Sequence, residues 1–318
     1  MTKKIFGGVV IFVLTSLFTG CGNSPGEDSA KISAESEQNV IEDDLGRKIF
    51  LNKKFEKIAV TSASFLEPLH EVGGEIVGRP DSKNKMPEWA KDISSVGKVY
   101  QIDVERLLAC NPDLVVVNKG MNEKLLGVLE ENEIPAVVLE MKTYDEVKHG
   151  ISIFSQLTGN IDKGEKIISD MDSEINRIIE SMPREKKRVS ILHGTAQGLS
   201  VQLDGSIAGG IVKMFGWENV ASGMTPLEKN PDAAPYSMET LAEQNPEIIF
   251  VTGMGDSDEI KAGIEEMIAS NEAWQTIGAI KNKQIYYLPQ DLFLLSPGLH
   301  YPEAVKIMAR LIYPDLPG

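Results

Sequence analysis

One phrase of the chain occurs twice and constrains the fold more than any other feature. The stretch "VERLLACNPDLVVV" covers residues 104–117, and "METLAEQNPEIIFV" covers residues 238–251. In each copy a short helical segment ends at an Asn-Pro pair, because proline disfavours helical backbone at the residue before it. A continuous apolar run follows, which is typical of a strand buried in a parallel sheet. The repeat therefore predicts two similar lobes, each containing the same helix–strand corner.

Short helices and strands alternate on both sides of a long helical segment. Residues 41–142 and 188–318 each alternate apolar runs with helical patterns, which predicts α/β lobes with mainly parallel sheets. Over residues 143–187 apolar residues instead recur at helical spacing, and a break near "LTGN" at 157–160 would either kink or divide this helix. We therefore predict two Rossmann-like lobes bridged by a long α-helix, with a cleft between the lobes.

The first residues have the pattern of a targeting segment. Two lysines precede an apolar run over 5–18, which is shorter than the roughly 20 residues that a membrane-spanning helix needs. With small residues before Cys21, the pattern resembles a bacterial lipoprotein signal. It predicts a signal peptide over 1–20, a lipid on the thiol of Cys21, and a flexible tether over 21–40 that is rich in Ser, Gly and Glu. An ordinary signal peptide or a lone anchor helix is the alternative.

Charge and motif content argue against several classes of function. The net charge is −15, whereas nucleic-acid binding needs a basic surface, so we expect no nucleic-acid partner. The sequence contains no GxSxG, P-loop or HExxH motif. Two cysteines, Cys21 and Cys110, are too few for a zinc or iron–sulfur site, and Cys110 is expected to pack as a small hydrophobe. These features predict a protein without enzymatic activity.

The four histidines are scattered and form no constellation with a nucleophile. His70 and His149 fall on predicted helices and are expected on helix surfaces. His193 ends a predicted strand, and His300 follows "LSPGL" in a loop. Ligands of open α/β sheets bind where strands end and loops begin, so His193 and His300 are candidates to face the cleft.

The order of these segments resembles the class III solute-binding lipoproteins of ABC importers, which carry iron–siderophores, haem and vitamin B12. The resemblance rests on the lipobox, the long interlobe helix and three stretches: "KIAVTSASFLEPLHEVGGEIVG", "SVGKVYQIDVERLLACNPDLVVV" and "AIKNKQIYYLPQDLFLLSPGLHYPEAVKIMARLIYP". It runs from residue 41 to the end. It implies a shallow cleft, little hinge motion, and a monomer that is lipid-anchored on the extracytoplasmic face of the cell membrane. Its partners would be an ABC permease and the ATPase of that permease.

The resemblance also gives the repeated phrase a role. In the vitamin B12-binding relative, one glutamate on each lobe meets arginines of the permease, and the matching positions here are Glu105 and Glu239. A carboxylate early in a helix is favoured by the positive end of the helix dipole. Two such carboxylates, one on each lobe, would orient the protein on a two-fold permease. The alternative is that each glutamate merely caps its helix.

The C-terminal half looks most similar to haem-binding lipoproteins of Gram-positive bacteria, which hold iron with a methionine from one lobe and a histidine from the other. The positions that match these two ligands are Tyr100 and Met254. Tyrosine and methionine are both known ligands of haem iron. Haem bound by Tyr100 and Met254 is therefore the expected cargo, with His300 and His193 as reserve ligands. The alternative is that Tyr100 stacks on the ligand, or caps the loop, without touching iron.

Cationic residues do not decide between the possible ligands. Lys98, Lys119 and Arg79 fall on predicted cleft-side loops, where they would serve a charged iron chelate and haem propionates equally well. A ferric siderophore is the second candidate and cobalamin the third. The rival from another class is a metallocluster enzyme or chelatase on a similar two-lobed scaffold. That rival predicts cysteine ligands at the cleft.

Overall fold

The computed structural model describes residues 40–82, 86–195, 198–294 and 296–316. The predicted signal peptide, Cys21 and the predicted tether up to residue 39 lie outside the described residues. Contacts divide the chain into residues 1–40 and residues 41–318, and the lobes described below belong to the second unit. Within the described part of the chain, no helix is long and apolar enough to cross a membrane.

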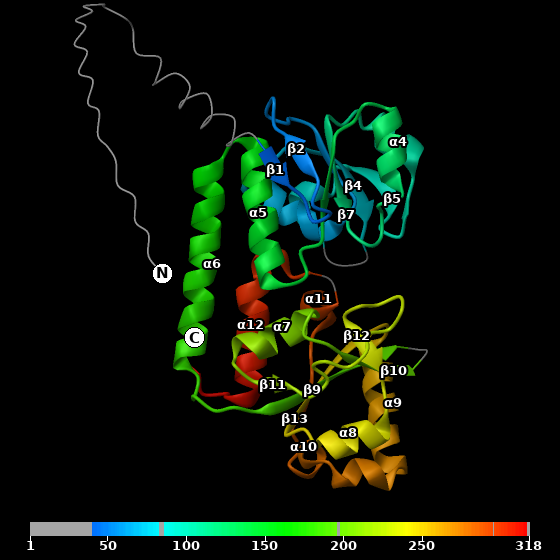
Figure 1. Cartoon of the computed structure of the whole chain (residues 1–318), viewed down its shortest axis with the longest axis vertical. Coiled ribbons are helices and arrows are strands. Elements are labelled where there is room, and N and C mark those ends of the chain that lie inside the picture. The colour runs from blue at the N-terminus through cyan, green and yellow to red at the C-terminus, as the bar shows by residue number, and fades with distance from the viewer. Residues whose placement is uncertain (1–39, 83–85, 196–197, 295, 317–318) are drawn as a thin grey trace, which may run out of the picture. The chain divides into compact units, whose positions relative to one another are not determined.

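The N-lobe is the part of the molecule built on the first large sheet (Figure 1). The strand order is β6-β5-β4-β3-β7-β8, and every pair is parallel except β5 with β6. The strands are β3 (Ile58–Val60), β4 (Ile76–Asp81), β5 (Ser94–Lys98), β6 (Gln101–Ile102), β7 (Leu114–Asn118) and β8 (Ala136–Leu139). The helices are η1 (Ala63–Phe65), α2 (Leu66–Glu71), η2 (Glu88–Ala90), α3 (Val104–Ala109) and α4 (Leu125–Glu131).

Helices cover both faces of this sheet because successive strand residues point to opposite sides. Val60 and Val116 belong to the buried cluster that contains α2 and α5 residues. Val115 and Val117 belong to another cluster, with residues of α3 and α4. Both faces of β7 are thus apolar, which explains the continuous run "LVVV" in the sequence.

The C-lobe is built on a second sheet of order β12-β10-β9-β13-β14. β9, β13 and β14 are parallel, β10 is antiparallel to β9 and β12, and β11 pairs with β9 in parallel. The strands are β9 (Arg188–Thr195), β10 (Gly198–Gln202), β11 (Glu218–Asn219), β12 (Ala233–Pro235), β13 (Ile248–Met254) and β14 (Ile285–Tyr287). The helices are α7 (Ile207–Met214), α8 (Met238–Gln244), α9 (Ser257–Ser270), η3 (Glu272–Thr276), α10 (Gly278–Lys281), α11 (Gln290–Phe293), η4 (Gly298–His300) and α12 (Tyr301–Ile312). The predicted pair of α/β lobes is confirmed.

The repeated phrase folds as the same corner in each lobe, α3 followed by β7 and α8 followed by β13. Asn111 and Asn245 both have left-handed backbone, with φ of 49° and 45°. Asparagine tolerates this conformation better than most residues, and it commonly ends a helix there. The paired Asn-Pro letters are therefore explained by the turn that leads from a helix into a buried strand.

The connection between the lobes consists of two helices, so the break near "LTGN" divides the predicted helix over 143–187 and does not merely kink it. α5 (Tyr144–Thr158) begins with a capping box between Thr143 and Glu146 and ends at Gly159. Gly159 has φ of 71°, a left-handed conformation that glycine adopts readily. The chain then reverses, and α6 (Ile161–Ser181) lies side by side with α5 and with α12 of the C-lobe (Figure 1). The break occurs within "LTGN", so α6 alone runs from one lobe to the other.

A two-stranded sheet of β1 (Val40–Glu42) and β2 (Lys48–Phe50) is attached to the N-lobe through Asp43. The buried Asp43 carboxylate accepts hydrogen bonds from Arg47 Nε at 3.0 Å and from the backbone N–H of Val138 in β8 at 3.0 Å. Burial by itself would raise the pKa of Asp43, but these hydrogen bonds outweigh it and hold the pKa below its usual 3.8. The next residue, Asp44, accepts from the backbone N–H of Glu140 at 2.7 Å.

We expect Asp43→Asn to lower the free energy of unfolding at neutral pH by about 2 kcal/mol, because an amide loses charge-assisted bonds to buried donors. Since the folded pKa is depressed, the contribution of Asp43 is complete above its unfolded pKa and is lost as pH falls through the folded value. Urea denaturation at neutral and acidic pH measures this difference. The exposed Asp92→Asn is the matched control, and equal effects of the two substitutions would contradict the assignment.

Candidate functional site

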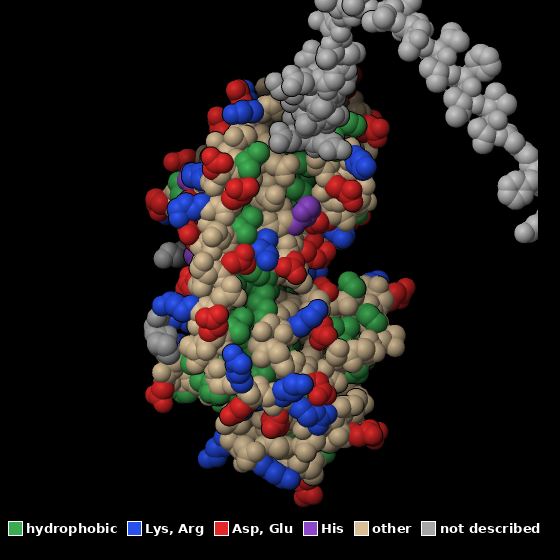
Figure 2. Space-filling model, turned by 60° about the vertical axis from the view of Figure 1, so that its left-hand side comes forward, with side chains coloured by type: hydrophobic (Ala, Val, Ile, Leu, Met, Phe, Trp, Pro, Cys, Tyr) green, Lys and Arg blue, Asp and Glu red, His purple; other side chains and the backbone are tan. Residues whose placement is uncertain are grey.

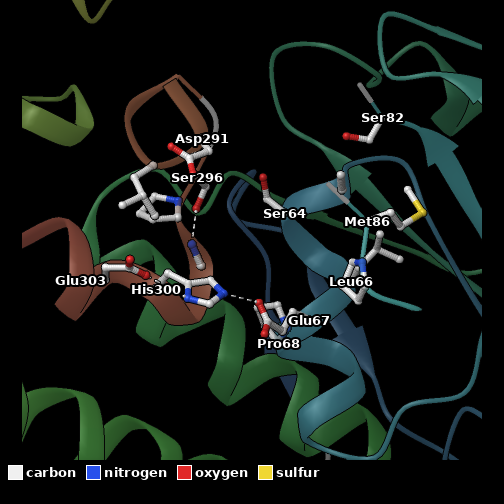
Figure 3. A pocket seen from close by; sticks show the side chains of 15 residues that line it. Ser64, Leu66, Glu67, Pro68, Ser82, Met86, Asp291, Ser296, His300 and Glu303 are labelled. Carbon is white, nitrogen blue, oxygen red and sulfur yellow. Dashed lines mark hydrogen bonds and ion pairs between the residues drawn. The ribbon is translucent and has the colours of Figure 1, made fainter. Parts of the chain in front are cut away.

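A pocket of about 300 Å³ lies between the N-lobe and the C-lobe. One wall comes from η1, α2 and the segment after β4, and includes Ser64, Glu67 and Met86. The other wall comes from α11, η4 and the start of α12, and includes Asp291 and Ser296 (Figure 3). In the space-filling view the surface is indented between the N-lobe above and the C-lobe below (Figure 2). The pocket therefore lies where loops follow strands β3, β4 and β14, as expected for a ligand site of an α/β fold.

His300 connects the two walls of this pocket. Its Nε2 lies 3.0 Å from Glu67 Oε2 of the N-lobe, and its Nδ1 lies 3.4 Å from Glu303 Oε2 (Figure 3). The His300 side chain is 53% exposed, so these ion pairs contribute modestly to stability. The prediction that His300 faces the cleft agrees with this position. Both ring nitrogens already face carboxylates, so His300 would have to give up one of them to bind a metal.

Tyr100 lies in the turn between β5 and β6, and 62% of it is exposed. The ammonium of Lys98 lies 5.7 Å from the centre of the Tyr100 ring, within the range of a cation–π contact. Asn122 donates a hydrogen bond to the carbonyl of Val99 at 2.8 Å, which ties this turn to the loop after β7. Met121 in that loop is also an exposed apolar side chain. Tyr100 and Met121 thus come from two tethered loops of the N-lobe.

Met254 is the last residue of β13, and 55% of it is exposed. It lines a second cavity, of about 200 Å³, together with apolar residues that include Leu199, Ile260 and Met267. Gln290 of α11 donates to the carbonyl of Gly255 at 2.7 Å, which connects this strand end to the wall of the interlobe pocket. Tyr100 and Met254 are therefore exposed on different lobes, each beside a strand end.

His193 on β9 is partly buried, and its Nδ1 lies 2.9 Å from the hydroxyl of Thr252 on β13. The Thr252 hydroxyl donates to the carbonyl of Leu192 at 3.3 Å, so the Thr252 oxygen accepts a hydrogen bond from Nδ1–H of His193. In this tautomer Nε2 of His193 carries the unprotonated lone pair. Burial lowers the pKa of His193, because the charged ring loses solvation. His193 is thus a neutral histidine inside the C-lobe sheet at neutral pH.

Glu105 and Glu239 are exposed in the first turns of α3 and α8. The helix caps are other residues: Asp103 accepts from the N–H of Arg106, and Ser237 accepts from the N–H of Thr240. Asp103 and Ser237 thus occupy the cap positions, and the docking role of Glu105 and Glu239 stays a prediction.

Arg79 is predicted to lie on a cleft-side loop, but its side chain instead contacts the segment around η2. Its guanidinium donates to the carbonyls of Ala90 at 2.8 Å and Lys91 at 3.2 Å, and its side chain is largely buried. Arg79 therefore holds the segment around η2 against β4, which is a structural role.

Sequence reasoning missed most of the residues that line the interlobe pocket. Ser64, Glu67 and Ser296 lie in segments that follow predicted strands, and that position was the one signal available. Among the described residues, no group of three or more His, Cys, Asp or Glu side chains is arranged to hold a metal ion.

Comparison with known proteins gives one family and several relatives. A family model described as periplasmic binding protein matches residues 58–292. The Fe(3+)-citrate-binding protein YfmC of Bacillus subtilis is 24% identical over 323 residues, which cover 98% of this chain and 98% of the relative. The high-affinity heme uptake system protein IsdE of Staphylococcus aureus is 22% identical over 81% of this chain and 88% of its own length.

Solved structures have the same fold. An ABC transporter substrate-binding protein from Listeria monocytogenes superposes with a TM-score of 0.73 at 25% identity, over 83% of this chain and 100% of that one. The structure of IsdE complexed with heme superposes with a TM-score of 0.70 at 20% identity, over 82% of this chain and 100% of that one.

The His193 environment predicts a loss of stability in mild acid. Because the folded pKa lies below the ordinary 6.5, the unfolded chain takes up the proton first, and stability falls as pH decreases through this window. We expect His193→Gln to lose less stability than the wild type between about pH 7.5 and about pH 5.5 in urea denaturation. His70 is exposed, so His70→Gln should show the same difference in the free energy of unfolding between the two pH values as the wild type. An unchanged pH dependence in His193→Gln would contradict the assignment.

Proposed function

Because the chain belongs to the periplasmic binding protein family, we propose that it captures an iron compound and delivers it to an ABC permease and its ATPase. Haem is the first candidate for the cargo. We further propose that the protein acts as a monomer, held by a lipid on Cys21 at the extracytoplasmic face of the cell membrane. The names of YfmC and IsdE, which bind ferric citrate and take part in heme uptake, support an iron compound.

The observation that carries the haem proposal is the exposure of Tyr100 and Met254 at strand ends of different lobes. Singly exposed apolar side chains are common on folded proteins, so it is the donor atoms that Tyr100 and Met254 present there that support haem. Tyrosine phenolate and methionine thioether are both ligands of haem iron. In this proposal the iron is cargo, and the protein contributes its ligands, orientation and shape without performing a reaction.

A ferric siderophore is the second candidate, and the interlobe pocket favours it. Ser64, Ser296 and Asp291 give this pocket hydrogen-bonding groups that suit a polar chelate better than a porphyrin face. Cobalamin is the third candidate, without a specific observation in its favour. The metallocluster rival needs a cysteine at the cleft, whereas the thiol of Cys110 donates to the carbonyl of Arg106 at 3.2 Å beside α3.

When purified protein is titrated with ferric haem, we expect the Soret band of the haem to shift. We expect Tyr100→Phe to remove the phenolate-to-iron charge-transfer band and to weaken haem binding about tenfold. Tyr313→Phe, after α12, is the matched control and should leave the spectrum unchanged. Absence of a Soret shift, together with tight binding of a hydroxamate or catecholate chelate, would replace haem by a siderophore. An unaltered spectrum in Tyr100→Phe would remove Tyr100 as the ligand.

For docking, we expect Glu105→Arg combined with Glu239→Arg to abolish uptake of labelled iron by cells while ligand affinity stays unchanged, because reversed charges repel permease arginines. Glu131→Arg with Glu266→Arg, at exposed positions of α4 and α9, makes the same change in net charge and should leave uptake intact. A loss of ligand affinity in the first double variant would place these glutamates in the binding site instead.

A further inference from the structure

Two lysines follow neighbouring strands at the edge of the N-lobe sheet. Lys119 comes directly after β7, and Lys142 comes three residues after β8. β7 and β8 are parallel and adjacent, so both lysines lie at the carboxyl ends of their strands. Glu140 lies between the two lysines in space, because its Oε2 pairs with the ammonium of Lys119 and its Oε1 pairs with the ammonium of Lys142.

The two lysines differ in how their charge is satisfied. Lys142 forms ion pairs with Glu140 and with Asp232 of the C-lobe, the latter at 2.7 Å. Burial opposes the charge on Lys142, but its hydrogen bonds to Asp232 and Glu140 outweigh this and raise its pKa, so it stays protonated. Lys119 Nζ lies 3.8 Å from Glu140 Oε2, a distance too long for a hydrogen bond. Lys119 therefore has a positive charge beside Glu140 with hydrogen-bond donors left for another acceptor.

This cluster shares its sheet edge with the interlobe pocket. The strand order β4-β3-β7-β8 places the segments after β4 and β3, which line the pocket, next to the loops that carry the lysines. Adjacent strands lie about 4.8 Å apart, so the end of β3 is about 10 Å from the end of β8. The side chains of Lys119 and Lys142 are 35% and 40% exposed. A cargo that extended from the pocket along this edge of the sheet would meet them.

We infer that Lys119 and Lys142 form the subsite for a carboxylate group of the cargo, and that Glu140 fills this subsite until the cargo arrives. This inference rests on the proposed function. Haem propionates and the carboxylates of a citrate-type ferric chelate have the required chemistry. The incoming carboxylate hydrogen-bonds to Lys119 and displaces Glu140 from between the two ammonium groups. Lys142 retains Asp232 throughout, so the connection between the lobes persists.

The chemical reason for the exchange is the poor geometry of the pair between Glu140 and Lys119, which is longer than the pair between Glu140 and Lys142. Glu140 is fixed through its backbone N–H to Asp44, so its side chain reaches Lys119 only at ion-pair distance. A ligand carboxylate is free to approach to hydrogen-bond distance, and charge-assisted hydrogen bonds are about twice as strong as neutral ones. The cluster contains two lysines and two carboxylates, so a cargo carboxylate adds charge to a site that is neutral overall. The gain therefore depends on Lys119, whose donors are available.

The test compares haem with haem dimethyl ester, which keeps the porphyrin and iron but lacks propionate charges. We expect wild-type protein to bind haem about tenfold more tightly than the diester. Lys119→Gln should bring this ratio close to one without changing affinity for the diester, and Glu140→Gln should raise the affinity for haem by removing the competitor. Lys166→Gln, on the exposed part of α6 and paired with Asp170, makes the same charge change as Lys119→Gln and should leave the ratio as in the wild type.

The outcomes separate the subsite from the proposed function. Wild-type protein that binds haem and the diester equally well overturns the carboxylate subsite and leaves haem as the cargo. A wild-type preference that Lys119→Gln retains also overturns the subsite, because the preference then comes from other residues. Wild-type protein that binds neither haem nor ferric citrate overturns the inference together with haem as the cargo, and tight binding of a hydroxamate or catecholate chelate by the same protein would leave capture of an iron compound in place.

Discussion

The arrangement of the molecule depends on one buried core that both lobes share. A single apolar cluster contains residues of both sheets, of α5 and α6, and of α12. At its centre the rings of Tyr144 and Tyr301 lie 5.2 Å apart, and Tyr301 is fully buried. Separating the lobes would expose this apolar surface at about 25 cal/mol for each Å². The shared core therefore holds the two lobes together as one unit.

Much of the fold followed from the sequence, because local patterns determine it. The Asn-Pro phrases, the apolar strands and the helical spacing of 143–187 rest on backbone preferences within a few residues. The reversal at Gly159 was harder to predict, since a glycine in "LTGN" fits both a kink and a full turn. Only the packing of α6 against α5 and α12 determines which of the two occurs.

The site was less predictable for a physical reason. Its contacts join residues far apart in the chain, such as Glu67 with His300 and Lys142 with Asp232, and no local pattern reports such a pair. Tyr100 and Met254 were selected by resemblance alone, and the structure adds that they are exposed. The pocket has hydroxyls and carboxylates, whereas the exposed N-lobe side chains Tyr100 and Met121 are largely apolar. That combination suits a cargo with one apolar face and a charged edge.

The rigid core also bears on the two copies of the repeated phrase. Each copy is fixed to its lobe by a buried strand. With the little hinge motion that the resemblance implies, the separation between the Glu105 and Glu239 carboxylates would change little when the cleft fills. A partner that contacted only these two side chains would meet nearly the same surface on empty and loaded protein. Empty protein would then compete with loaded protein for the same docking position. The rate of delivery would therefore depend on the fraction of the binding protein that is loaded, and not only on the concentration of loaded protein.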